Sequence, residues 1–450
     1  MSNNDFIIRT LGIKEKDVDS ITTGVDENGT FITVVKLKRI KMTCDFCGAP
    51  MISNGHYKKK VHSPTIRGYD GTIYYYANRY YCKVCGKTKV QNNPFSYKNF
   101  SSSFSLQISV MNYLKEPNYT IKMIADELHI SKTTVNNYLD SYILTIKKDL
   151  PEWLGIDEVY SPKLACKGNS YLCVLTDGES RKIYDILESR GKRFLKDYFE
   201  YYYTLEERKT VKYVTMDMWE PYRDDAKKVF PNCIIAVDPF HFIKHLCDDF
   251  ERVRIRTMNK QQYGSPSYYL LKKWNWLLKI DDIELGNEPK YNRVFKEKLN
   301  YEDIFNMLMK NFPELSKAYK LKEKFRLFVQ EASYDKAVET YDEYLNDFKT
   351  CGIKEYEEFT NILINWRNEI INSFYRPYDD RKLTNAYTER INGEIRKHIT
   401  ISHGLGNFNR FKKRMIYALN SEKGEDKPKG FALKPKLDYS LRNKKNKLDK

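Results

Sequence analysis

Two pairs of closely spaced cysteines set the tightest limit on how this chain can fold. Cys44 and Cys47 form one CxxC unit, Cys82 and Cys85 form a second, and a glycine follows each unit. Thiolates two residues apart can grip one cation, and two such units supply the four sulfurs of a tetrahedral zinc site. Because four sulfurs leave no open coordination position, we expect a structural zinc ion. Four buried free cysteines are the alternative, but they would not need this paired spacing.

The charge balance favours a polyanionic partner. Lys and Arg outnumber Asp and Glu by 77 to 60 in 450 residues, which gives a net charge of +17, and cationic side chains displace counterions from phosphates. A lysine-rich proteome is the alternative explanation. Nine cysteines are an odd number, which fits metal binding in a reducing compartment better than a disulfide framework. Neither a signal peptide nor a membrane-spanning stretch is visible, so we expect a cytoplasmic, nucleoid-associated protein.

Residues 119–139 have the pattern of a helix-turn-helix. The segment 119–128 predicts a helix, 129–131 a turn and 132–139 a second helix, with Ser131 as its N-cap. The side chains that point outward from the second helix are of the types that contact phosphates and base edges in a major groove. An ordinary helical hairpin is the alternative. We expect DNA contacts from Lys132, Thr133, Thr134, Asn136 and Asn137.

The middle of the chain predicts a mixed β-sheet. Strand signals at 153–158, 170–176 and 182–188 read as an antiparallel meander, and helices then link strands at 211–216 and 233–237. Three antiparallel strands followed by helix-linked strands are typical of a ribonuclease-H-like fold, which belongs to the α/β class. A long polar segment with helical periodicity comes next and predicts an α-helical insertion.

Three acids far apart in the sequence are candidates for one metal site. Asp157 ends an apolar stretch, Asp217 ends another, and Glu389 lies in a helix-like run. Carboxylates at strand ends and on a nearby helix can share two divalent cations, which activate water or a sugar hydroxyl against a phosphodiester. Magnesium suits carboxylate ligands that leave several waters in place, and manganese is the expected substitute. A surface carboxylate is the ordinary alternative for each acid taken alone.

Four short motifs follow the cysteine pairs and the helix-turn-helix along the chain, and three of them contain the acids. They are Gly155-Ile156-Asp157-Glu158, Met216-Asp217-Met218, Asp238-Pro239-Phe240-His241 and Asn385…Glu389…Asn392. Together with the cysteine pairs and the helix-turn-helix, they resemble the ISL-three family of bacterial insertion-sequence transposases. The resemblance runs from about Cys44 to residue 420. The chain departs from the family in having Arg390 where a glycine is common, and Thr384-Asn385-Ala386 where Ser-Asn-Gly is common.

The resemblance implies a DDE transposase with a ribonuclease-H-like catalytic domain. Asp157, Asp217 and Glu389 would be its metal-binding triad, holding two magnesium ions. Groups that support the triad are expected from Asp238, His241 and Asn392. A buried core histidine remains the alternative for the histidine.

Basic residues after Glu389 extend the expected DNA surface. Contacts with DNA are expected from Arg396, Lys397, Lys412 and Lys413. The expected domains are an N-terminal segment 1–43, a zinc-binding module 44–98, a helix-turn-helix domain 99–150, the first part of the catalytic core 151–245, a helical insertion 246–375, the rest of the core 376–420, and a basic tail 421–450.

The expected function is cleavage and transfer of DNA strands at the terminal inverted repeats of an insertion sequence. Because both ends must be held together before joining, we expect a homodimer on double-stranded DNA. Two alternatives stay open. One is a catalytically inactive or domesticated DNA-binding regulator, and the other is a structure-selective nuclease of the same fold.

Overall fold

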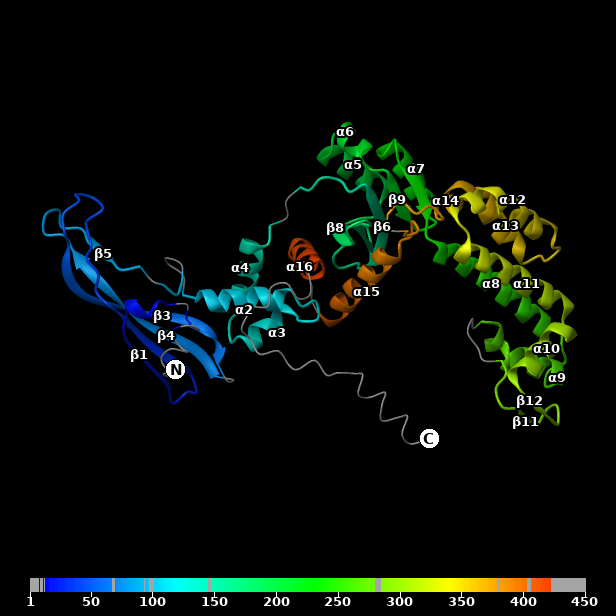
Figure 1. Ribbon diagram of the computed structural model, residues 1–450, viewed down its shortest axis with the longest axis horizontal. Helices are drawn as coiled ribbons and strands as arrows, with labels where there is room; N and C mark the ends of the chain where they lie inside the picture. The colour runs from blue at the N-terminus through cyan, green and yellow to red at the C-terminus, as the bar shows by residue number, and fades with distance from the viewer. Residues whose placement is uncertain are drawn as a thin grey trace.

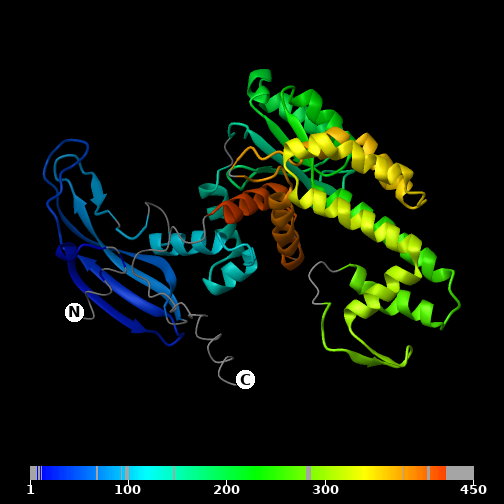
Figure 2. The same cartoon turned by 45° about the vertical axis from the view of Figure 1, so that its right-hand side comes forward.

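A computed structural model gives the fold, with an N-terminal sheet at one end, a mixed sheet in the middle and a group of helices at the far end (Figure 1, Figure 2). Apart from Ser421, the expected basic tail lies outside the described residues. The structure describes residues 8, 11, 13–66, 69–92, 94–96, 101–144, 147–279, 285–378, 380–402 and 406–421.

The first sheet joins the N-terminal segment to the cysteine region. Its strand order is β1-β2-β4-β3, with β5 paired to β4 on the cysteine side. The long strands β3 and β4 form an antiparallel hairpin, whereas β2 runs parallel to β4. Val35, Ile73 and Tyr75 are buried in the core of this sheet. The elements are η1 (Glu15–Asp17), β1 (Val18–Val25), β2 (Phe31–Leu37), β3 (Ile52–Ile66), β4 (Tyr69–Tyr81) and β5 (Thr88–Val90).

Three short helices follow, and two of them match the predicted helix pair. Each begins at a side chain that accepts a hydrogen bond from the backbone of its first turn, and these caps are Ser103, Thr120 and Ser131. Ile124 and Val135 are buried between the helices, as the apolar spacing predicted. The helices are α2 (Phe104–Leu114), α3 (Ile121–Glu127) and α4 (Lys132–Tyr142).

The central sheet has the mixed topology that the sequence predicts. Its order is β10-β9-β6-β7-β8. Strands β6, β7 and β8 are antiparallel neighbours, whereas β9 and β10 run parallel to β6. The strands are β6 (Trp153–Tyr160), β7 (Tyr171–Asp177), β8 (Lys182–Leu187), β9 (Tyr213–Met216) and β10 (Ile234–Val237).

Helices cover both faces of this sheet. Leu154 and Ile156 of β6 pack toward α5 and α7, whereas Val159 packs with Ile391 and Ile395 of α15. Because side chains alternate along a strand, Asp157 lies on the α15 face. The helices are α5 (Lys192–Tyr202), α6 (Leu205–Lys209), α7 (Glu220–Val229), α15 (Ala386–Ile401) and α16 (Phe408–Asn420).

A helical insertion separates β10 from α15, as predicted, and it has its own apolar core around Phe242, Phe325 and Phe359. It also contains a small hairpin that the sequence did not reveal. Among the helices of the described ranges, none is long and apolar enough to cross a membrane. The elements are α8 (Pro239–Asn259), α9 (Pro266–Lys273), η2 (Asn275–Leu278), β11 (Lys290–Asn292), β12 (Glu297–Leu299), α10 (Tyr301–Asn311), α11 (Pro313–Glu331), α12 (Tyr334–Thr350), α13 (Tyr356–Asn365) and α14 (Arg367–Asn372).

Buried polar contacts fasten α15 and α16 to the three short helices. His398 Nδ1 lies 2.6 Å from the carbonyl oxygen of Pro117, so the ring donates its proton there, and Ser402 Oγ lies 3.1 Å from Nε2. Arg414 is 2% exposed, and Nη2 of its guanidinium donates to three backbone carbonyls. Those carbonyls belong to Tyr113, Glu116 and Tyr119, which end α2 and lead into α3.

The buried imidazole makes stability sensitive to acid. Burial, aided by the charge of Arg414, lowers the pKa of His398 to about 4. The unfolded chain binds this proton near pH 6.5, whereas the folded chain does not. The contribution of His398 to the free energy of unfolding is therefore complete above that pH and falls as the pH falls toward 4. From about pH 7 to about pH 5, His398 should account for a loss of about 2 kcal/mol in the free energy of unfolding.

His398→Asn tests this expectation, because the Asn amide can still donate to Pro117 but does not titrate. Urea unfolding at both pH values should show a smaller acid-induced loss in the variant than in the wild type. Equal losses in the two proteins would contradict the assignment.

Candidate active site

Adjacent strands bring two of the three acids together. Ile156 of β6 and Met216 of β9 are register partners in the parallel pair. Asp157 is the residue after Ile156, and Asp217 is the residue after Met216. Their backbones are therefore neighbours at about the 4.8 Å spacing between strands. Glu389 lies in the first turn of α15, which packs on the same face of β6 as Asp157.

His241 links Asp217 to Glu389. Its Nε2 atom lies 2.9 Å from Asp217 Oδ1 and 3.6 Å from Glu389 Oε1, so these two oxygens are within about 6.5 Å of each other. Burial lowers the pKa of His241, but the hydrogen bond and the charge of Asp217, with those of Asp238 and Glu389, outweigh burial and raise it. The structure therefore brings the three acids and this histidine into one cluster.

Asp157 is the buried member of the cluster. Its side chain accepts hydrogen bonds from Asn392 Nδ2 at 2.6 Å and from the backbone N–H of Glu158 at 2.6 Å. Burial first, and then the charge of Asp217, raise the pKa of Asp157 to about 7. Asn392 Oδ1 is buried and finds no donor among the described residues. A cation would offset the repulsion between the carboxylates, and a water bound to that cation would donate a hydrogen bond to Asn392 Oδ1.

Among the described residues, the group whose ligand atoms all lie within 4.8 Å of one another is the cysteine cluster, and the three carboxylates do not form such a group.

Asp238 and Asn385 fix the start of α15. Asp238 caps α8 by accepting from the backbone N–H of Phe240 at 2.8 Å, and its other oxygen accepts from the N–H of Asn385. The Asn385 amide donates to the carbonyl of Ile156 at 3.0 Å. Both carboxylate oxygens of Asp238 are thus used by backbone groups, which suits a residue that positions Glu389 rather than one that binds metal itself.

Gly155 allows α15 to approach the sheet this closely. A Cβ at position 155 would lie 2.4 Å from Thr176 Oγ1 and 2.6 Å from Thr388 Oγ1. These two hydroxyls are hydrogen-bonded to each other at 2.6 Å. The glycine two residues before Asp157 is therefore a packing requirement of the acid cluster.

Gly155→Ala should consequently destabilise the protein by about 1–3 kcal/mol, the usual cost of overpacking. Gly393→Ala is the matched control on α15, because no atom lies within 4 Å of its added Cβ, and it should stabilise the helix by about 0.5–1 kcal/mol. Urea unfolding measures both. Two variants of equal stability would refute the close approach.

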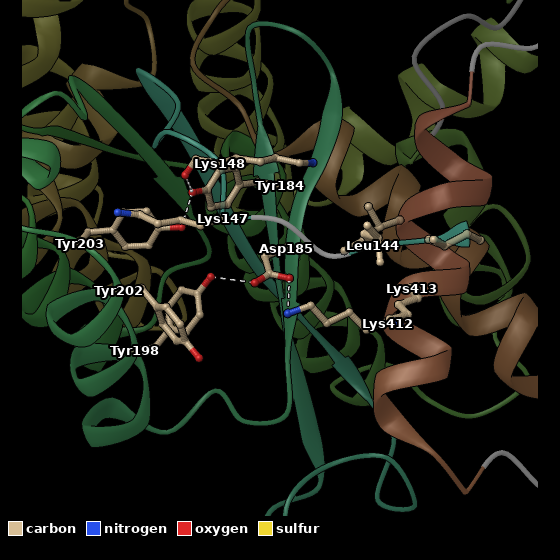
Figure 3. A pocket seen from close by; sticks show the side chains of 12 residues that line it. Leu144, Lys147, Lys148, Tyr184, Asp185, Tyr198, Tyr202, Tyr203, Lys412 and Lys413 are labelled. Atoms are coloured by element: carbon tan, nitrogen blue, oxygen red, sulfur yellow. Dashed lines mark hydrogen bonds and ion pairs between the residues drawn. The ribbon is translucent and has the colours of Figure 1, made fainter. Parts of the chain in front are cut away.

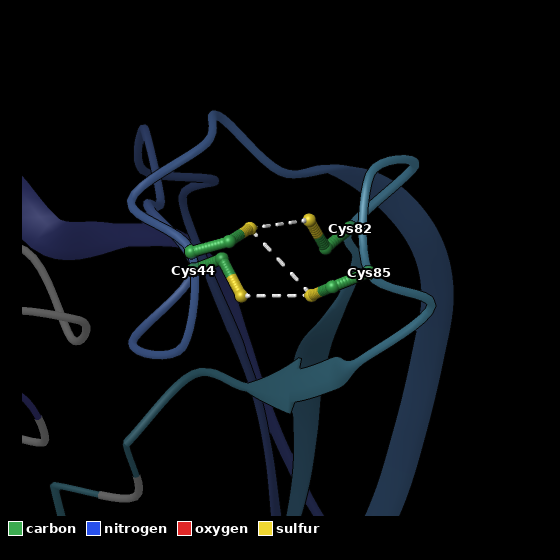
Figure 4. A group of neighbouring side chains, drawn as sticks. Cys44, Cys82 and Cys85 are labelled. Carbon is green, nitrogen blue, oxygen red and sulfur yellow. Dashed lines mark hydrogen bonds between the residues drawn. The ribbon is translucent and has the colours of Figure 1, made fainter.

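The four predicted cysteines form one cluster (Figure 4). Sulfur-to-sulfur distances are 3.5 Å for Cys44 and Cys85, 3.5 Å for Cys47 and Cys82, and 3.6 Å for Cys47 and Cys85. Sulfurs bound to tetrahedral zinc at about 2.3 Å lie about 3.8 Å apart, so the cluster fits one zinc ion.

The turns around the cysteines favour thiolates. Backbone N–H groups of Phe46 and Cys47 lower the pKa of Cys44 to about 7, and backbone N–H groups also lower the pKa of Cys82. The pKa values of Cys47 and Cys85 are raised, because burial and the neighbouring cysteines outweigh the backbone N–H groups there. Each unit ends in a glycine with a positive φ angle, 69° at Gly48 and 71° at Gly86, which L-residues with side chains rarely adopt. The glycines noted in the sequence thus close both turns.

Comparison with known families bears on the acid cluster. Residues 154–415 match a family model described as transposase, that of the ISL-three DDE type. The chain belongs to the ISL-three family of transposases. The match begins in β6, ends in α16 and contains all three acids. No curated protein matches the chain.

In this ISL-three transposase, the residues expected to contact DNA through α4 are mostly accessible. Lys132, Thr133 and Asn137 are exposed, whereas Thr134 and Asn136 are half-buried. Their contact with DNA remains a prediction.

The basic residues of α15 and α16 divide into two groups. Arg396 and Lys397 are exposed, although Lys397 pairs with Glu394 at 2.8 Å. Lys412 instead lies 2.6 Å from Asp185 Oδ1, beside a tyrosine-lined pocket (Figure 3). Lys413 donates to the carbonyl of Asp140 at 3.4 Å. DNA contacts by these four residues stay predictions, and Lys397, Lys412 and Lys413 already have partners within the protein.

Sequence reasoning missed the role of Asn385 in the transposase. The signal was present, because Asn385, Glu389 and Asn392 are spaced four and three residues apart and so share one helix face. The hydroxyl pair behind Gly155 had no comparable signal, because Thr176 and Thr388 are distant in sequence.

Proposed function

We propose that this ISL-three transposase is a DDE enzyme with a ribonuclease-H-like core that cuts and joins DNA. The observation that carries the proposal is the convergence of Asp157, Asp217 and Glu389, with His241 in contact with two of them. Sheet order supports the fold assignment, because β6, the first strand of the antiparallel meander and the middle strand of the sheet, carries the first acid, and the second acid directly follows the parallel strand beside it.

The three carboxylates are the residues that would hold two magnesium ions. Bound there, the ions would activate water or a 3′-hydroxyl and stabilise the leaving oxygen. The chain's own contribution is orientation. Asn392 holds the Asp157 carboxylate, and Asp238 with Asn385 fixes the helix that presents Glu389. Rigid support of this kind is what preorganised catalytic groups require.

DNA recognition is assigned to the N-terminal third of the chain. The helix pair α3–α4 has the order, the capped second helix and the accessible polar side chains of a helix-turn-helix. The cysteine cluster would hold zinc and stabilise the N-terminal sheet, whose strands β3 and β4 lie between the two cysteine pairs. A homodimer would hold two inverted-repeat ends together for joining.

The test is cleavage of a duplex that carries the DNA bracketing the gene, with magnesium present. The proposal expects 3′ ends nicked at the repeat border and no cleavage when the repeat is scrambled. A structure-selective nuclease would cut branched DNA whatever the terminal sequence. An inactive regulator would bind the repeat without cutting it.

A further inference from the structure

A cavity of about 640 Å³ lies where the helix-turn-helix meets the last two helices, and residues of α3, α4, α15 and α16 line it. Figure 1 shows α16 beside α4, and the buried contacts of His398 and Arg414 hold the two parts together there. Glu389 lies in the first turn of α15 and His398 in its last. The length of this helix therefore separates the cavity from the acid cluster.

One wall of the cavity contains a buried cation, Arg414. Its Nη2 atom donates to neutral backbone carbonyls. The Nε and Nη1 atoms are buried as well, and neither has a hydrogen-bond partner among the described residues. Burial outweighs the nearby acidic groups of Tyr417 and Glu116 and lowers the pKa of Arg414 to about 10, so the guanidinium is still charged at neutral pH. A buried charge with unused donors is costly unless an anion compensates it.

The other groups around the cavity also suit an anion. In the part of the chain that the structure describes, no residue that lines the cavity is acidic. Lys122 of α3 and Lys132 of α4 line it, and both are exposed. A third cation, Arg410, is held by Asp140, with 2.7 Å between Nη2 and Oδ2.

Two helices begin at the wall of this cavity. Lys132 is the first residue of α4, and Asn407 is the N-cap of α16. The first backbone N–H groups of a helix attract negative charge. Helix ends and cationic side chains from three elements therefore surround the same space.

A phosphate group fits these donors better than a carboxylate does. Its oxygens point in tetrahedral directions and can accept from several sides at once, whereas a carboxylate has two oxygens in one plane. The position favours phosphate from DNA, because Lys132 and Asn136 line the cavity and are also among the residues expected to contact DNA.

We propose that this cavity binds a phosphate group, which Lys122 and Lys132 contact and behind which Arg414 supplies positive charge. Under the proposed function, the phosphate belongs to the backbone of the DNA that α4 contacts, and this identity rests on that function. Free phosphate is the other source of the same chemistry. Binding at the cavity itself requires neither cleavage nor magnesium.

The first experiment titrates the full-length protein with inorganic phosphate in a calorimeter, without magnesium and with sodium chloride holding the ionic strength constant. Lys122→Ala removes an exposed cation. Arg414→Gln keeps an amide that can donate to a carbonyl group but removes the charge. Lys310→Ala is the matched control, because Lys310 is an exposed lysine of α10 in the insertion.

The wild type and the control should bind phosphate equally well. Lys122→Ala and Arg414→Gln should each bind it about tenfold more weakly, the usual effect of losing one hydrogen bond to a charged group. Equal binding by all four proteins would mean an adventitious ion only and would overturn the proposal. If Arg414→Gln does not fold, Lys122→Ala still decides, because its side chain is exposed.

The second experiment identifies the source of the phosphate. Duplexes of the DNA that brackets the gene carry one neutral methylphosphonate at a time, and their affinity is measured without magnesium. If DNA supplies the phosphate, one position should weaken binding to the wild type about tenfold. The same position should not affect Lys122→Ala, because that variant has already lost the contact.

The two experiments together decide the proposal. Inorganic phosphate binding that depends on Lys122, with no such position in the duplex, would assign the cavity to free phosphate. A wild type that binds no inorganic phosphate and has no such position in the duplex would overturn the proposal.

The proposed function and the phosphate site fail separately. A wild-type protein that shows no magnesium-dependent cleavage would refute the proposed function and leave the phosphate titration valid. Normal cleavage, with no effect of Lys122→Ala in either experiment, would refute the phosphate site alone.

Discussion

Asp157→Asn is expected to lower the rate of magnesium-dependent strand cleavage on the order of 10³-fold. Asp157 is 6% exposed and stands in the electrostatic field of Asp217 and Glu389. Metal ions contribute several kcal/mol of transition-state stabilisation, and each 1.36 kcal/mol changes the rate about tenfold. Asn keeps the size of the side chain but removes the charge that would hold the ions.

Single-turnover cleavage of the end duplex measures this loss. Asp197→Asn is the control, because Asp197 is an exposed acid on α5 and its loss should leave the rate unchanged. Affinity for the uncut duplex should stay close to that of the wild type, which separates a chemical defect from a binding defect. A variant that cuts as fast as the control would remove Asp157 from the active site.

Cys82→Ser is expected to release zinc and to unfold the N-terminal sheet. Cys82 is fully buried in the cluster, and a structural zinc site contributes roughly 10–16 kcal/mol of apparent binding free energy to folding. The cluster closes the end of the β3–β4 hairpin, since Cys82 directly follows β4. Loss of one ligand should therefore be felt along the sheet.

Metal analysis should find one zinc per wild-type chain and substantially less in the variant. Thermal unfolding should show an earlier transition for the N-terminal sheet, whereas the central sheet, with a separate core, should unfold as before. Cys166→Ser is the control, because Cys166 lies outside the cluster. Metal-free wild-type protein that melts like the holoprotein would contradict a structural zinc site.

The sequence predicted those parts of the fold that depend on local pattern. The central strands begin and end within about two residues of the predicted limits, because alternation and turn residues are local signals. The second helix of the pair begins at Lys132 as predicted, since Ser131 caps it. The cysteine cluster was also predictable, because spacing alone fixes which sulfurs can share an ion.

The sequence could not predict which partners the long-range contacts would choose. Arg414 belongs to a run of basic residues that reads as a DNA-facing surface, yet it is buried against backbone carbonyls. Lys412 reads in the same way and pairs with Asp185. The sequence around a cationic side chain does not indicate which acceptor tertiary packing will place beside it. The parallel pairing of β2 with β4 is hidden for the same reason.

The sequence predicted the acids of the candidate site but not the hydrogen bonds that position them. Each of Asp157 and Asp217 ends an apolar run in the sequence, and in the structure Asp157 lies within β6 while Asp217 directly follows β9. The hydrogen bond that Asp238 accepts from the backbone N–H of Asn385 joins residues on either side of the long insertion. No periodic pattern in the sequence predicts a contact over that separation.

Dissection or recombination of the molecule must respect the bonds made by His398 and Arg414. A fragment ended after Leu150 would strip Tyr113, Glu116 and Tyr119 of the guanidinium that binds their carbonyl oxygens. Exchange of the first 150 residues between relatives would need a compatible α15 and α16 in the recipient. The helices assigned to reading DNA and the helix that carries Glu389 are thus expected to be inherited as one block, although the long insertion separates them in the gene.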